Sequence, residues 1–173
     1  ETAPEEATTG PAERGAARDA DGAFSPDGPF LSAVAAEPML AGLRLIAEPW
    51  DLGPGGYRLG GYPEGWSEWN DRFRDDARRF WRSEWDALSA FARRVSGSRD
   101  VFGARSPWAS INYVTSHDGY TLRDLVSYEH KHNLANGHGN TDGTDDNRSW
   151  NCGVEGETDD PQVLACRRRQ QRN

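Results

Sequence analysis

The chain has 173 residues, of which 35% are hydrophobic and 28% charged, with 28 acidic and 20 basic side chains. Its formal net charge of -8 argues against nucleic acid or an anionic membrane surface as a partner, and we expect neither. No apolar run approaches the roughly 18 residues of a membrane span, so we expect a soluble chain. Aromatic residues make up 10% and include seven Trp, too many for a disordered acidic chain.

Residues 1–28 are rich in Ala, Gly and Pro and carry acidic side chains, so we expect a loop or disordered lead-in. Apolar residues within 30–34 then predict a helix that ends near Pro38. The apolar run over residues 43–47 predicts a buried strand, and Glu48 follows it directly. A loop rich in Gly and Pro comes next.

Two amphipathic helices are predicted after this loop. The first has apolar residues at Phe73, Ala77, Phe80 and Trp81, and a solvent face of Arg72, Arg74, Asp75, Arg78 and Arg79. The second repeats the apolar spacing and ends at a glycine, with the residues Trp85, Leu88, Ala92, Val95 and Gly97.

The carboxyl-terminal third begins with an alternating pattern over residues 109–115, which predicts a second strand ending before residues 116–119. Residues 121–128 predict a short helix, and a polar loop covers 131–158. Residues 159–161, Asp-Asp-Pro, predict the start of a last helix, because carboxylates and Pro both favour a first turn. The alternation of helices with two visible strands predicts a parallel α/β fold.

Candidate catalytic residues follow the two predicted strands, where parallel α/β folds place their chemistry. Glu48 follows the first strand, and His117 and Asp118 follow the second. Two carboxylates facing one cavity suffice for glycoside hydrolysis, and an imidazole can bind a sugar hydroxyl. Trp50 and the aromatic residues after it are candidates for stacking on sugar rings. A strand-end Glu can equally be an ion-pair partner, and most loop aromatics are anchors.

Other sites have weaker support. The glycines of residues 53–56 lack the spacing of a dinucleotide-binding loop. His130, His132 and His138 match no standard metal-site spacing, so we expect no metal and no cofactor. The two cysteines form no CxxC pair and no disulfide framework, which favours a reducing compartment and a cytoplasmic location.

Four stretches of the sequence together resemble the alpha-amylase superfamily, glycoside hydrolase family 13, and within it the glycogen debranching enzymes of the isoamylase type. The resemblance covers roughly residues 24–173. The stretches are Leu45-Ile-Ala-Glu-Pro-Trp-Asp51, Glu68-Trp-Asn-Asp-Arg-Phe-Arg-Asp75, Asn112-Tyr-Val-Thr-Ser-His-Asp-Gly119 and Asp145-Asp-Asn-Arg-Ser-Trp-Asn-Cys-Gly-Val-Glu-Gly156.

This resemblance implies retaining hydrolysis of α-1,6 branch linkages in glycogen or limit dextrin. It also implies a partial (β/α)8 TIM barrel over residues 29–173, holding about strands 5 to 7 with their helices. Glu48 would be the general acid/base at the end of the fifth strand, and Asp118, after the seventh, would stabilise the transition state. His117 and Trp50 would bind the α-glucan.

The sequence departs from the family at the nucleophile. The family's nucleophilic Asp lies in a region before the Glu, and that region is absent here. An earlier family region with its own Asp and His, and the eighth strand, are absent as well. A covalent intermediate cannot form without the nucleophilic Asp. We therefore expect a piece of a longer enzyme, starting at Glu1 without an initiator Met, that is inactive without the rest of the barrel. The alternatives are a non-catalytic glucan-binding or interaction fragment, and a parent with α-1,4-hydrolysing or branching specificity.

Overall fold

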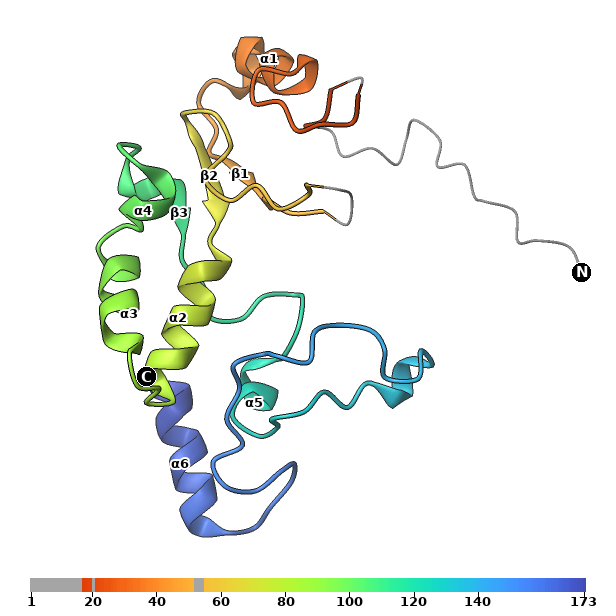
Figure 1. Ribbon diagram of the computed structural model, residues 1–173, viewed down its shortest axis with the longest axis vertical. Helices are drawn as coiled ribbons and strands as arrows, with labels where there is room; N and C mark the ends of the chain where they lie inside the picture. The colour runs from red at the N-terminus through yellow and green to blue at the C-terminus, as the bar shows by residue number, and fades with distance from the viewer. Residues whose placement is uncertain (1–16, 20, 52–54) are drawn as a thin grey trace, which may run out of the picture. The chain divides into compact units, whose positions relative to one another are not determined.

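The computed structural model describes residues 17–19, 21–51 and 55–173 (Figure 1). The chain divides into two compact units, Glu1–Trp69 and Asn70–Asn173. The described residues contain both helices and short strands, with parallel strand pairing, so the coarse prediction of an α/β structure is confirmed, although no helix lies among the described residues between the first two strands. No helix in this part of the chain is long and apolar enough to cross a membrane. Residues 1–16 of the predicted lead-in lie outside the described residues.

The described residues of the first unit form one α-helix and two parallel strands. Helix α1 (Pro29–Ala36) begins with Pro in its first turn and buries Leu31, and the 3-10 turn η2 (Pro38–Leu40) follows it, as the Pro38 stop predicts. Strand β1 (Leu45–Ala47) pairs in parallel with β2 (Trp66–Trp69), with Ala47 opposite Glu68. The connection between them contains turns and no helix in its described residues, 48–51 and 55–65.

In this unit the sequence misses one strand and predicts another with the wrong extent. Strand β2 was not predicted, because four residues are too few to show a strand periodicity. The buried strand predicted over residues 43–47 is shorter, and Ile46 in its centre is exposed. A parallel strand is buried on both faces only where other elements cover both. Only Ala47 of β1 is buried within this chain.

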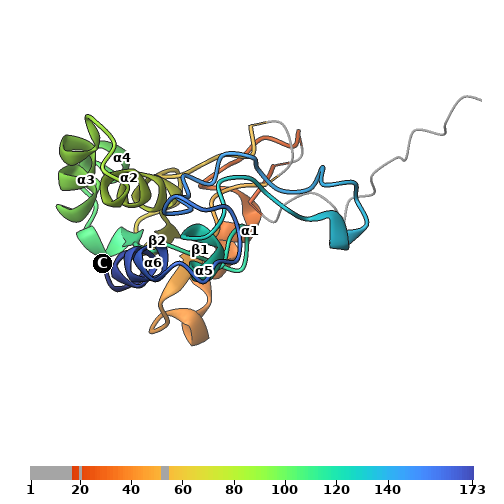
Figure 2. The ribbon, with the colours of Figure 1, turned by 90° about the horizontal axis from the view of Figure 1, so that it is seen from below.

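The second unit packs helix α2 (Asp71–Trp81) against α3 (Ala87–Val95), and the two lie side by side in both ribbon views (Figures 1 and 2). The Phe91 ring of α3 stacks on Phe80 of α2, with ring centroids 4.6 Å apart. The buried Asn70 caps α2 by accepting the Phe73 amide, and its own amide group donates to Ser98 and Ser110.

The helices form where predicted, but two of the predicted faces are wrong. Arg78, assigned to the solvent face of α2, is only 7% exposed. Trp85, assigned to the apolar face of the second helix, lies before α3 and is 95% exposed. The buried face of α3 instead carries Ala87 and Arg94. Arg94 turns inward because its guanidinium pairs with Asp76, at 3.1 Å, and with Asp100.

After α3 come the short helix α4 (Arg99–Phe102), the 3-10 turn η3 (Pro107–Ala109) and strand β3 (Ser110–Ile111). The strand predicted over residues 109–115 is thus much shorter. Helix α5 (Leu122–Leu125) lies inside the predicted 121–128 and is followed by the polar loop, which holds the 3-10 turn η4 (Leu134–Asn136). Cys152, which is buried, and Cys166, which is partly exposed, are free cysteines in the structure.

Helix α6 (Pro161–Arg172) begins where the sequence predicts. The Asp160 carboxylate accepts hydrogen bonds from the backbone amides of Gln162, at 2.7 Å, and Val163, at 3.4 Å. These amides have no carbonyl partner inside the helix, so the cap supplies one.

Replacing Asp160 with Ala removes this cap, and we expect a loss of about 1 kcal/mol in the free energy of unfolding. The measurement is urea denaturation of the full chain followed by circular dichroism. Asp159→Ala is the matched control, because Asp159 is the exposed neighbour and the cap hydrogen bonds are accepted by Asp160. Equal urea midpoints for the two variants would contradict the capping role.

Candidate active site

Glu48 follows directly after β1 and is exposed. The next residue, Pro49, is fully buried, and its carbonyl accepts the Arg58 amide at 2.7 Å. The Asp51 amide donates to the Gly56 carbonyl at 3.2 Å. These two bonds fold the chain after Glu48 back on itself. A buried, bonded residue therefore adjoins the exposed carboxylate and limits the freedom of its backbone.

Glu48 lines a pocket of about 190 Å³ within the first unit, the Glu48 pocket. Its aromatic side is formed by Tyr62, whose ring centroid lies 5.2 Å from that of Phe24 and 5.6 Å from that of Trp66. The other lining residues are Ala17, Arg18, Pro49, Trp50, Asp51, Gly56 and Arg58. A carboxylate beside flat aromatic rings suits a sugar ring, whose faces are apolar and whose rim is polar.

An ion pair ties the described part of the lead-in to this pocket. The Arg18 guanidinium donates to both oxygens of Asp51, at 2.6 Å and 3.1 Å, so the pair is bidentate. The hydrogen bond to Asp51 raises the pKa of Arg18. Neither Arg18 nor Phe24 was predicted to take part in a site, since nothing in the local Ala- and Gly-rich sequence distinguishes them.

The loop after Glu48 needs glycine at position 56. A Cβ atom on Gly56 would lie 2.2 Å from the Asp51 carbonyl oxygen and 2.4 Å from its Oδ1. We expect Gly56→Ala to lower the free energy of unfolding by about 1–3 kcal/mol, because the neighbouring backbone must shift. Urea denaturation of the full chain measures it. Gly42→Ala, with nothing within 4 Å of its added Cβ, is the control and should change stability little. Similar losses for both would contradict the clash.

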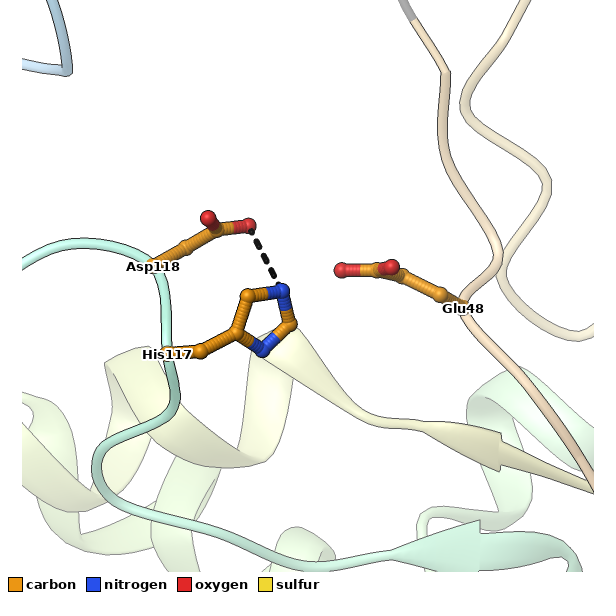
Figure 3. Close-up of side chains that lie close together, drawn as sticks. All are labelled: Glu48, His117 and Asp118. Carbon is orange, nitrogen blue, oxygen red and sulfur yellow. Dashed lines mark ion pairs between the residues drawn. The ribbon is translucent and has the colours of Figure 1, made fainter.

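His117 and Asp118 lie in the second unit, in a turn reached from β3 through residues 112–116. Their side chains are 70% and 68% exposed, and His117 Nε2 lies 3.7 Å from Asp118 Oδ2 (Figure 3). The Ser116 hydroxyl donates to the Asp118 carbonyl and accepts the Asp118 amide, both at 3.3 Å. Gly119 follows at φ +77°, a left-handed conformation that favours glycine. The turn leaves the Asp118 carboxylate open to solvent.

Arg78 supports the segment that leads into this turn. Its guanidinium donates to the Val114 carbonyl, at 2.6 Å and 2.9 Å, and to the Asn147 carbonyl, at 2.8 Å. Burial lowers the pKa of Arg78 to about 10. The buried Arg78 side chain of α2 thus links residues 112–116, which follow β3, to the polar loop that contains Asn147.

The structure therefore places Glu48 and Trp50 together in one pocket and His117 beside Asp118. That both pairs face a single cavity stays a prediction, as do the roles assigned to them. The sequence pattern does not distinguish Glu68 or Asp51 as site residues, although they lie in the family-like stretches 68–75 and 45–51.

An exposed carboxylate at the end of a parallel strand, beside aromatic rings, forms a small pocket that can take a sugar ring. Comparison with known proteins gives independent information. The chain is 56% identical over 146 residues to the glycogen operon protein GlgX homolog of Mycobacterium tuberculosis (strain ATCC 25618 / H37Rv), covering 83% of this chain and 20% of the relative. No family model matches the chain.

Two further relatives are named glycogen debranching enzyme. That of Pectobacterium carotovorum subsp. carotovorum (strain PC1) is 55% identical over 143 residues, covering 82% of this chain and 22% of the relative. That of Dickeya chrysanthemi is 53% identical over 147 residues, covering 84% and 22%. The chain thus spans about a fifth of the length of these relatives. The identities confirm the resemblance seen in the motifs: the chain is a homologue of part of the glycogen debranching enzymes.

Proposed function

We propose that this chain supplies part of the catalytic barrel of a glycogen debranching enzyme, which hydrolyses α-1,6 branch linkages in glycogen or limit dextrin with retention. The observation that carries the proposal is identity at more than half of the aligned positions, over about four-fifths of the chain, with relatives named for debranching. In this proposal β1, β2 and β3 are the fifth, sixth and seventh strands of a (β/α)8 barrel. The parallel pairing of β1 with β2 supports that assignment.

Glu48 acts as the general acid/base in this proposal. A retaining glycosidase first protonates the leaving glycosidic oxygen and then deprotonates the attacking water with the same carboxyl group. Glu48 is exposed at the pocket, so it can exchange protons with water and meet a substrate oxygen. Trp50 lines the same pocket and supplies a ring for stacking on a glucosyl unit.

Asp118 stabilises the positive charge of the oxocarbenium-like transition state, and His117 donates a hydrogen bond to a hydroxyl of the same sugar. The exposure of both side chains supports contact with a glucan. The nucleophilic carboxylate is not among the motifs of this sequence, and we propose that residues outside it provide that group. The chemistry uses carboxyl groups alone and needs no metal or cofactor. A cytoplasmic location, suggested by the free cysteines, belongs to the same proposal.

A chimera tests this function. The matching 143-residue segment of the Pectobacterium carotovorum enzyme is replaced by that of this chain, and reducing ends released from limit dextrin and from linear amylose are measured. We expect the chimera to debranch limit dextrin within about tenfold of its host, and the chain alone to release nothing. Preference for amylose would indicate α-1,4 specificity. Turnover by the chain alone would contradict its catalytic incompleteness, and glycogen binding by the chain with an inactive chimera would favour a binding module.

A further inference from the structure

Glu68 is a fully buried carboxylate, 0% exposed, on strand β2. In the parallel register it lies opposite Ala47, the residue that directly precedes Glu48. Taking a carboxylate out of water is unfavourable unless hydrogen bonds or counter-charges replace the solvent. A residue with this chemistry, at the strand end beside the proposed acid, requires a physical reason.

One reason is the backbone amide of Gly60. This amide donates to Glu68 Oε2 at 2.6 Å, a short hydrogen bond to a charged acceptor. Gly60 has φ +85°, a left-handed conformation that L side chains rarely adopt. The Gly60 turn also includes the bond from the Gly61 amide to the Arg58 carbonyl, at 2.8 Å. The carboxylate therefore holds a turn with an unusual backbone conformation.

This turn belongs to the loop that lines the Glu48 pocket. Arg58 donates its amide to the carbonyl of Pro49, the residue after Glu48, and Tyr62 forms the aromatic side of the pocket. Glu68 is thus linked to the residue beside Glu48 by three hydrogen bonds along this loop: Gly60 to Glu68, Gly61 to Arg58, and Arg58 to Pro49. Burial, followed by the negative charge of Glu68, raises the pKa of Tyr62, which is consistent with the closeness of this carboxylate to the pocket wall.

We propose that Glu68 is a positioning residue that fixes residues 56–62 through the Gly60 amide and so holds the Glu48 pocket in its working shape. Glu68 acts through the loop and does not touch the glucan. The loop-fixing step stands on the structure of this chain. The catalytic consequence rests on the proposed function of Glu48.

Three substitutions separate the hydrogen bond from the charge. Glu68→Gln keeps the reach and an acceptor oxygen but removes the charge. Glu68→Asp keeps the charge but shortens the side chain by one methylene, so it no longer reaches Gly60. Glu68→Ala removes both. Glu64→Ala is the matched control, because Glu64 is an exposed glutamate on the same segment.

The first readout is amide hydrogen exchange of residues 56–62 in the full chain. We expect exchange at Gly60 to rise about tenfold or more in Glu68→Ala and Glu68→Asp, and to stay within about threefold in Glu68→Gln and Glu64→Ala. Unchanged exchange in Glu68→Ala would overturn the proposal. Greater protection of the Gly60 amide in Glu68→Asp than in Glu68→Gln would also overturn the proposal. It would show that the negative charge matters and the length of the side chain does not.

The second readout is kcat and KM of the chimera, normalised to the folded fraction. A displaced catalytic group loses rate steeply, so we expect kcat/KM to fall about 100-fold in Glu68→Ala and to recover at least tenfold of that loss in Glu68→Gln. A loosened loop with unchanged kcat/KM per folded molecule would show a structural role and overturn the positioning role. An inactive chimera with Glu68 intact would instead count against the proposed function, while hydrogen exchange still decides the loop-fixing step.

Discussion

Replacing Glu48 with Gln lowers the rate of limit-dextrin debranching by the chimera about 1,000-fold, within the 100- to 10,000-fold range of general acid–base catalysis. Gln has the size and hydrogen-bonding reach of Glu but cannot donate a proton to the glycosidic oxygen. Glu48 is exposed and its neighbour Pro49 is anchored by Arg58, so the substitution leaves the loop contacts in place. We therefore expect kcat to fall while KM and the urea midpoint change little.

Two changes of reactant distinguish the loss of acid/base catalysis from a nonspecific loss of activity: a substrate with a better leaving group and an added anionic nucleophile. An aryl α-glucoside whose leaving group needs no protonation should keep a rapid first step in Glu48→Gln. Azide should then accelerate the second step, because an anionic nucleophile needs no general base. Glu64→Gln, at an exposed glutamate of the same unit, serves as the control and should keep the full rate. Unchanged debranching by Glu48→Gln, or an equal loss on both substrates, would show that Glu48 is not the acid.

The parts of the fold that sequence predicted are those decided by neighbouring residues. The start of α6 follows from Asp160 and Pro161, whose effects act within one helical turn. The end of β1 at Ala47, and thus the place of Glu48, follows from an apolar run that stops at a charged residue and a Pro. In both cases the physical cause lies within a few residues of its effect.

The parts that were missed depend on partners far along the chain. Arg18 enters the Glu48 pocket because Asp51, 33 residues later, accepts its guanidinium. Strand β2 is four residues long and exists because β1 pairs with it. Glu68 is a charged residue type that is rarely buried, yet it is buried here because a turn eight residues earlier, beyond the reach of a strand pattern, offers an amide. Such pairings have no signature in a local hydrophobic pattern.

The position of Arg78 also depends on partners far along the chain. Among the substitutions considered, its replacement has the largest expected effect on stability. The amphipathic pattern placed it on the solvent face of α2, whereas it is buried and donates to carbonyls 36 and 69 residues away, those of Val114 and Asn147. Burial opposes its charge, which is why its pKa falls to about 10. The three hydrogen bonds oppose that penalty, since charged donors form stronger bonds than neutral ones.

The sign of the Arg78→Met effect depends on which of these contributions is larger. Met matches the length of the stem and removes the buried charge, which is favourable, but it leaves two carbonyls without this donor. Each buried acceptor left unsatisfied costs about 1–3 kcal/mol, so we expect a net loss of about 2–4 kcal/mol in the free energy of unfolding. Arg78→Lys keeps the positive charge but lacks the planar guanidinium. It should recover part of the lost stability, because the ammonium group can donate a hydrogen bond to one of the two carbonyls.

Urea denaturation of the full chain measures this loss, and the adjacent Arg79→Met is the matched control. Arg79 pairs with Glu84 and Asp86 near the surface, and such pairs contribute about 1 kcal/mol or less. Since Val114 precedes His117 by three residues, Arg78→Met should also lower kcat of the chimera at temperatures where the protein stays folded. Coincident urea midpoints for the Arg78 and Arg79 variants would show that the buried guanidinium contributes no more than a surface ion pair.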